Sequence, residues 1–185
     1  MDRPLLILCE GPRDANYIVN NFLANRNVVI SVHSYKEKDD LIRRVVSKRI
    51  SGAIIIVEEG KQRLFGNIAA LVSKPRSIDM DLEILAVFDS DSPDTKRAIE
   101  NLVKSRIEST IRNRFPKPKL RPHYTAKQST EYSYEVTIKY VSGYTLTLHL
   151  FAVPYSLEYW LEHRGSHSLT WIKALRNIVE RLIPK

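Results

Sequence analysis

Short apolar runs that alternate with longer amphipathic segments constrain the fold of this chain more than any other feature. Runs about as long as one β-strand, rich in Ile, Leu and Val, lie at residues 4–9, 27–34, 53–57 and 82–88. Helical spacing of apolar residues follows these runs, at residues 14–23, 37–50, 61–73 and 95–115. The alternation predicts an α/β domain whose mostly parallel sheet is covered by helices on both faces.

The last third of the chain has a different pattern. Apolar and polar residues alternate over 132–140 and again over 146–150, with a Ser-Gly turn between the two stretches, and this predicts a β-hairpin. A short helix is expected at 155–163, followed by a final helix that Ser168 caps.

A basic, proline-broken stretch at 115–124 predicts a linker between these two parts. The chain then divides into an α/β core at 1–118 and a hairpin and helical extension at 119–185. Because 185 residues are enough for one domain but marginal for two, we expect both parts to pack in the same domain.

Charge and composition narrow the class of protein. The formal net charge is +8, and basic proteins often bind polyanions such as nucleic acid. Cys9 is the only cysteine, which excludes an intrachain disulfide and a cysteine-based zinc site. No apolar run approaches the roughly 20 residues that cross a bilayer, and the apolar stretch at 5–9 is too short for a signal-peptide core. We expect a cytoplasmic protein with no membrane partner.

Acidic side chains follow three of the predicted strands at the point where each strand ends. They are Glu10, Glu58, Glu59, Asp89 and Asp91. Ligands of parallel α/β sheets bind beyond the carboxyl ends of the strands, so these acids are candidates for a functional site.

Asp89 and Asp91 flank a single serine, and strand alternation predicts that both carboxylates point to the same side. Two adjacent carboxylates repel each other unless a cation lies between them, and oxygen ligands of this kind suit Mg²⁺ or Mn²⁺. The alternative is structural, because Asp91, Ser92 or Asp94 can simply cap the helix that follows.

Two segments resemble the motifs of the Toprim domain family, which occurs in primases, topoisomerases, recombination proteins and small nucleases. Residues 5–14 (LLILCEGPRD) are similar to the first motif, and residues 85–91 (LAVFDSD) are similar to the second. The resemblance covers about residues 4–115. It implies a Toprim-like parallel sheet, Glu10 as an acid/base or metal ligand, and an Asp89/Asp91 pair that holds Mg²⁺.

Two further positions carry the resemblance less closely. Residues 53–61 (AIIIVEEGK) resemble the strand–glycine–lysine step of some small Toprim proteins, but two glutamates stand where glycines are common. Lys61 is therefore either a phosphate contact or a surface residue at a helix start. Glu158 follows a late strand, as an acid does in small Toprim proteins and overcoming-lysogenization-defect nucleases, which implies a further metal ligand. The alternative for Glu158 is a first-turn acid that favours the helix dipole.

Basic residues concentrate in one region of the chain. Nine Lys and Arg residues but only two acids lie between Lys96 and Arg121. This helix is either a solvated face or a phosphate-binding surface, and Lys96 and Arg97 are its first candidate contacts. Arg13, directly after the first motif, is another candidate phosphate ligand.

These features together predict Mg²⁺-dependent phosphoryl transfer on nucleic acid, with a small Toprim nuclease as the simplest form. The alternative is a non-catalytic Toprim-like module that binds nucleic acid or protein. A haloacid-dehalogenase-type phosphatase motif at 88–93 ranks below both, because that motif normally follows the first strand and no Asp follows Asp94. The choice between DNA, RNA and nucleotide, the protein partners and the oligomeric state remain open.

Overall fold

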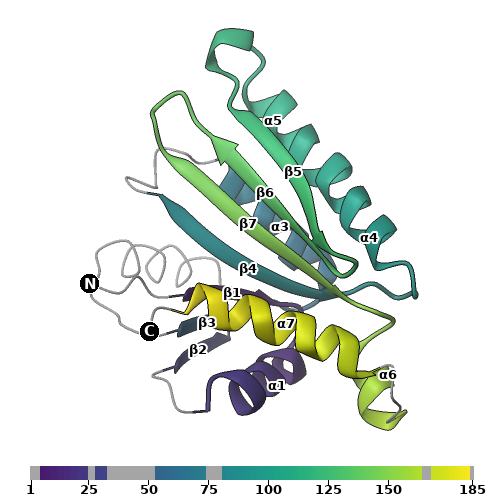
Figure 1. The fold of residues 1–185 in the computed structure, drawn as a ribbon. Coiled ribbons are helices and arrows are strands. Elements are labelled where there is room, and N and C mark those ends of the chain that lie inside the picture. The colour runs from purple at the N-terminus through teal and green to yellow at the C-terminus, as the bar shows by residue number, and fades with distance from the viewer. Residues whose placement is uncertain (1–4, 25–27, 33–52, 74–80, 164–167, 184–185) are drawn as a thin grey trace.

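One twisted sheet organises the molecule. The computed structural model describes residues 5–24, 28–32, 53–73, 81–163 and 168–183. Seven strands of these residues form a single sheet in the order β2-β3-β1-β4-β7-β6-β5 (Figure 1). The helix predicted at 37–50 lies outside the described residues.

Five neighbouring strands of this sheet are parallel. They are β2 (Val28–Val32), β3 (Ala53–Val57), β1 (Leu5–Cys9), β4 (Leu82–Asp89) and β7 (Thr145–Val153). All five residues of β1 and of β3 are buried, as expected for strands covered on both faces. The prediction of an α/β fold with a mostly parallel sheet is confirmed.

The hairpin prediction is also confirmed, but its place in the sheet is new. β6 (Ser133–Lys139) pairs antiparallel with β7, and β7 then continues the sheet by pairing in parallel with β4. The linker predicted at 115–124 is wrong at its end, because β5 (His123–Thr130) begins there and pairs with β6. Most of β5 is exposed at the sheet edge, so its sequence has no apolar alternation that would reveal a strand.

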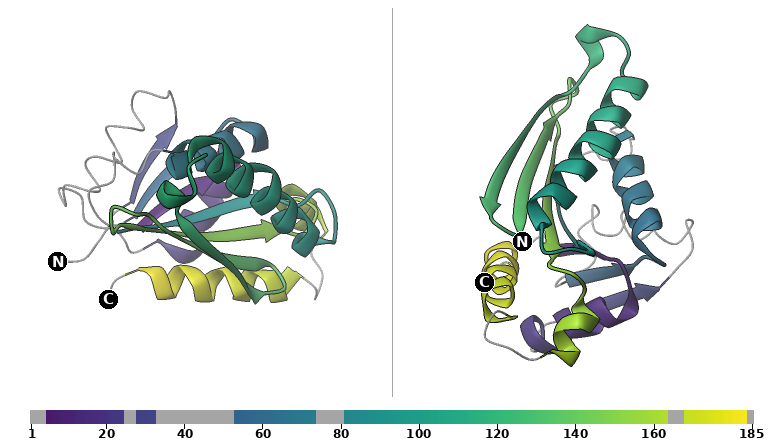
Figure 2. Two further views of the ribbon diagram at one scale, coloured as in Figure 1. Left: turned by 90° about the horizontal axis from the view of Figure 1, so that it is seen from above. Right: turned by 90° about the vertical axis from the view of Figure 1, so that its right-hand side faces the viewer.

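Helices cover both faces of the sheet (Figure 2). One face carries α1 (Pro12–Phe22), α6 (Leu157–Glu162) and α7 (Ser168–Leu182). The other face carries α3 (Lys61–Ser73), α4 (Thr95–Leu102), the π-helical segment η2 (Val103–Glu108) and α5 (Ser109–Arg114). The helix predicted at 95–115 therefore exists, with a wider turn in its middle, and the short 3₁₀ helix η3 (Pro118–Leu120) follows it.

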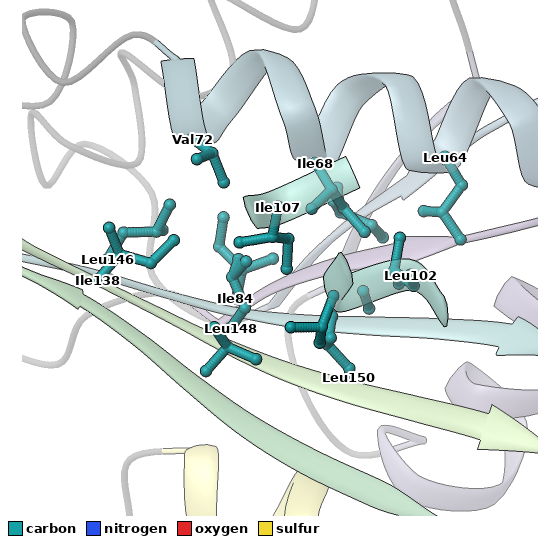
Figure 3. Packing of buried hydrophobic residues seen from close by; sticks show 14 of the residues in the cluster. Leu64, Ile68, Val72, Ile84, Leu102, Ile107, Ile138, Leu146, Leu148 and Leu150 are labelled. Carbon is teal, nitrogen blue, oxygen red and sulfur yellow. The ribbon is translucent and has the colours of Figure 1, made fainter. Parts of the chain in front are cut away.

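The two faces have separate hydrophobic cores because successive strand residues point to opposite sides. Leu64, Ile68 and Val72 of α3 pack with Ile84 and Leu148 on one face (Figure 3). On the other face, the apolar sides of α1 and α7 pack against alternate residues of β1, β4 and β7. Within the described residues, no helix is long and apolar enough to cross a membrane.

The buried seam between β4 and β7 gives a test of the packing. Leu148 is fully buried, whereas Leu169 is 66% exposed on α7. We expect Leu148→Ala to lower the free energy of unfolding by about 2–5 kcal/mol, because it removes apolar contacts and leaves a cavity. The matched Leu169→Ala variant should stay within about 0.5 kcal/mol of the parent. Urea denaturation followed by circular dichroism measures both, and equal effects would contradict this packing.

Candidate functional site

The carboxyl ends of four parallel strands meet at one edge of the sheet. Cys9 of β1 pairs with Val57 of β3 on one side and with Val87 of β4 on the other. Asp89, at the end of β4, pairs with Val153 of β7. The segments that follow these strands therefore lie side by side, and they carry most of the acids that the sequence singled out.

Glu10 and Asp89 are joined across this edge. The backbone N–H of Asp89 donates a hydrogen bond to Glu10 Oε2 at 3.2 Å. The Asp89 carboxylate in turn accepts a hydrogen bond from the backbone N–H of Leu157, with 3.1 Å between Leu157 N and Asp89 Oδ1. These two hydrogen bonds both involve Asp89. They hold the end of β4 against Glu10 on one side and against the start of α6 on the other.

Asp14 is a third member of this group. It lies in the first turn of α1, is buried, and accepts a hydrogen bond from the backbone N–H of Gly11, with 2.9 Å between N and Oδ2. Sequence reasoning did not select Asp14 as a site residue. A signal existed, because Asp14 stands four residues before Ile18 and so shares the apolar face of the predicted helix, where an acid is unusual.

The electrostatics of the group are those of acids crowded together. Burial, followed by repulsion from Asp14, Glu10 and Glu158, raises the pKa of Asp89 to about 7. Burial, opposed by the Gly11 hydrogen bond and reinforced by Glu10 and Glu158, raises the pKa of Asp14 to about 6. We call Glu10, Asp14, Asp89 and Glu158 the acidic group.

Glu158 joins the group from α6. It lies in the first turn of that helix, and its Oε1 is 3.4 Å from Arg13 Nη1 of α1. Figures 1 and 2 both show α6 next to α1, beyond the end of the sheet. Glu158 is thus close enough to raise the pKa values of Asp14 and Asp89, while Arg13 balances part of its charge at the surface.

Asp91 lies in a different environment from Asp89. β4 ends at Asp89, so strand alternation does not extend to Asp91, whose backbone is left-handed with φ of +58°. Its carboxylate is exposed and forms an ion pair with Lys61 Nζ at the start of α3. Gly60, with φ of +99°, permits the turn that brings this helix start to the acidic edge, and its N–H bonds to Glu10 O at 3.0 Å.

The two basic candidates of α4 are exposed. Lys96 Nζ lies 3.9 Å from Glu100 Oε1, and the backbone N–H of Arg97 donates to Asp94 Oδ1 at 3.0 Å. Asp94 therefore caps α4, which was one of the structural alternatives for this acidic stretch. Both cations point to solvent a few residues beyond Asp91.

The acidic group suits a hard divalent cation in its chemistry. All of its side-chain ligand atoms are oxygens. Burial, followed by repulsion from neighbouring carboxylates, raises the pKa values of Asp14 and Asp89, and a bound cation would relieve that repulsion. The side chains are not arranged as the ligands of a metal ion would be. Within the described residues, no group of three or more Asp, Glu, His or Cys side chains is placed so that it could hold a metal ion.

Comparison of the chain with family models, with curated proteins and with solved structures gave no match.

The raised pKa of Asp89 makes a prediction about stability. The folded protein keeps a proton on Asp89 up to about pH 7, whereas the unfolded chain loses it near pH 4. The folded state binds more protons across this window, so this contribution to the free energy of unfolding falls as the pH rises from about 4 to about 7. We expect Asp89→Asn to raise the melting temperature at pH 8, by about 2–4 °C once the partial exposure of the carboxyl is allowed for.

The same variant should have little effect on the melting temperature at about pH 3, where Asp89 is mostly protonated in both states. The control is Asp94→Asn, an identical chemical change at an exposed position that keeps an oxygen to cap α4. Thermal melts at both pH values measure the effect. A gain that does not grow with pH would contradict the crowding of acids around Asp89.

Proposed function

We propose that this chain is a divalent-metal-dependent phosphoryl-transfer enzyme that acts on nucleic acid, most simply a small nuclease of the Toprim kind. The observation that carries the proposal is the acidic group, in which carboxylates from the segment after β1 and from α1, β4 and α6 crowd at one sheet edge. Burial, reinforced by these neighbouring carboxylates, raises the pKa of Asp89 to about 7. Acids kept together against their mutual repulsion are typical of functional sites. The resemblance of residues 5–14 and 85–91 to Toprim motifs supports the same reading.

Glu10 and Asp89 are the residues that we expect to hold Mg²⁺ or Mn²⁺, with Glu158 as a further ligand. The bound ion would neutralise negative charge on the scissile phosphate. Asp91 would join the ligands by releasing Lys61, which leaves the ammonium group free to contact a phosphate oxygen.

Protein cations surround the acids in a way that suits a polyanionic substrate. Arg13 lies beside Glu158 on one side of the group, and Lys61 lies beside Asp91 on the other. Lys96 and Arg97 extend positive charge along α4, and the whole chain carries +8. Such a basic surrounding would offset the repulsion between the acidic group and the phosphates of a nucleic acid.

The first test is calorimetry with MgCl₂ or MnCl₂ near pH 6.5. Because Asp89 retains much of its proton at this pH, metal binding should release protons, and the measured heat should depend on the ionisation enthalpy of the buffer. We expect Asp89→Asn to weaken binding by at least the roughly ten- to a hundredfold that loss of an outer-shell partner costs. It should also reduce the buffer dependence to the part that Asp14 supplies. Asp94→Asn, outside the acidic group, should bind as the parent does.

Cleavage assays complete this test with labelled single-stranded, duplex and structured substrates in the presence of the metal. Cleavage that disappears in Glu10→Gln and Asp89→Asn but persists in Asp94→Asn would support the enzyme. A parent protein that binds neither ion, with or without nucleic acid, would refute the metal-dependent proposal.

A second candidate function is a non-catalytic module that binds nucleic acid. It is favoured by one observation, the ion pair of Lys61 with Asp91, which keeps one of the predicted metal ligands away from the acidic group. Such a module would bind nucleic acid equally well with and without divalent ions. It would also leave every substrate intact, and these two results together distinguish it from the enzyme.

A further inference from the structure

An exposed column of aromatic rings lies directly after the acidic edge. Tyr155 lies just before α6, Tyr159 lies within it and His163 is its C-cap residue, and their rings lie side by side. The ring centroids of Tyr155 and Tyr159 are 4.7 Å apart, and those of Tyr159 and His163 are 4.4 Å apart with planes only 19° from parallel. All three residues are exposed, which is unusual for a cluster of large rings.

Trp160 supports this column of rings. Trp160 contacts Tyr159 edge-on, with 5.3 Å between ring centroids and planes at 87°. Its indole N–H donates to Pro154 O at 2.6 Å, which fixes the indole against the end of β7. The exposed rings thus rest on a partly buried, hydrogen-bonded side chain and need little ordering before they meet a ligand.

A strained backbone holds the first ring of the column at the acidic edge. Tyr155 has a left-handed φ of +58°, a conformation that is rare for a bulky side chain, and Asp91 has the same φ. The two segments are bonded to each other, from Asp91 N to Tyr155 O at 2.8 Å and from Tyr155 N to Ser92 O at 2.9 Å. Strain of this kind persists where the surroundings enforce it and concentrates at ligand sites.

The column is therefore tied to the acidic group at several points. Tyr155 is bonded to the loop of Asp91, Leu157 N–H bonds to Asp89, and Glu158 precedes Tyr159 directly. Arg13 contacts Glu158 at the same place, so a cation that can hold a phosphate lies next to rings that can hold a base. A nucleotide carries its phosphate and its base only a few ångströms apart, so it can use a cation and an aromatic ring that lie next to each other.

We propose that the Tyr155–Tyr159–His163 column stacks an unpaired base, so that single-stranded nucleic acid is the substrate delivered to the acidic group. This inference rests on the proposed function and names its substrate class. Stacking on aromatic side chains accepts any base, because every base has a flat face, but it excludes bases that are already paired and stacked in a duplex. A single strand could stack its bases on these rings while its phosphates contact Arg13 and Lys61.

The test measures binding without metal, so that it does not depend on catalysis. Trp160 and Trp171 are the only tryptophans; Trp171 is buried, so a change in tryptophan fluorescence on binding reports on α6. The probes are oligothymidylate of about ten nucleotides, a typical single-strand site size, and an abasic strand of the same length, both in EDTA. The two probes carry the same phosphates and differ only in the bases.

We expect the parent protein to bind oligothymidylate about tenfold more tightly than the abasic strand, which is the size of effect that one stacked base gives. Tyr159→Phe, which keeps the ring, should retain this preference. Tyr159→Leu, which keeps an apolar side chain but loses the ring that Tyr155 and His163 both pack against, should lose most of this preference. The Leu variant should keep the parent's affinity for the abasic strand, which shows that it remains folded.

The outcomes separate the two proposals. Equal binding of both strands by the parent, or a base preference that survives largely intact in Tyr159→Leu, would overturn the stacking inference even if metal-dependent cleavage is found. A ring-dependent base preference in a protein that cleaves nothing would uphold the stacking inference and reject the nuclease. Tight binding of a duplex with the same fluorescence change would also overturn it.

Discussion

The pairing of β4 between β1 and β7 is the constraint on which the rest of the structure depends. Parallel pairing on both sides brings Asp89 beside the end of β1 and beside Val153 of β7. Two contacts of the acidic edge follow from it, the bond from Asp89 N–H to Glu10 and the bond from Leu157 N–H to Asp89. The strand is buried over most of its length, so the hydrophobic effect fixes its register.

That register brings negative charges together at a cost in free energy. A carboxylate that is partly buried beside three others is less stable as an ion, and the pKa of Asp89 rises to about 7 for this reason. The apolar contacts of both cores compensate, because they stabilise the same strands that carry the acids. The acidic group therefore persists in the fold without contributing to its stability at neutral pH.

The apolar patterns of contiguous residues predicted most of the strands and helices, whereas the pairing of strands far apart in the sequence could not be predicted from them. The apolar runs of β1, β3 and β4 and the alternation of β6 and β7 are properties of contiguous residues, so they are visible in sequence. The parallel contact of β7 with β4 joins segments about 60 residues apart and leaves no local signal. β5 is an exposed edge strand whose polar sequence resembles a loop.

The candidate site shows the same division. Glu10 and Asp89 follow apolar runs directly, and the expectation that they meet at one sheet edge holds, since Asp89 N–H bonds to Glu10. Asp14 ends the first Toprim-like motif but was not selected as a site residue, and an acid in the first turn of a helix also has an ordinary explanation in the helix dipole. The position of Asp91 could not be foreseen, because its left-handed backbone depends on hydrogen bonds to Tyr155, more than 60 residues away.

The strength of the ion pair between Lys61 and Asp91 decides how easily Asp91 could turn toward the acidic group as a further metal ligand. The ion pair of Lys61 and Asp91 has one largely exposed partner, and such pairs contribute only about 0–1 kcal/mol to stability. The left-handed backbone at Tyr155 costs on the order of 1–3 kcal/mol, which exceeds what the ion pair supplies, whereas Asp tolerates this conformation better. The loop is thus held in place by its backbone hydrogen bonds to Tyr155, and Lys61 is a weak partner that a cation or a phosphate can displace. Rotation of the Asp91 side chain away from Lys61 would cost little, while the aromatic column stays fixed through the same loop.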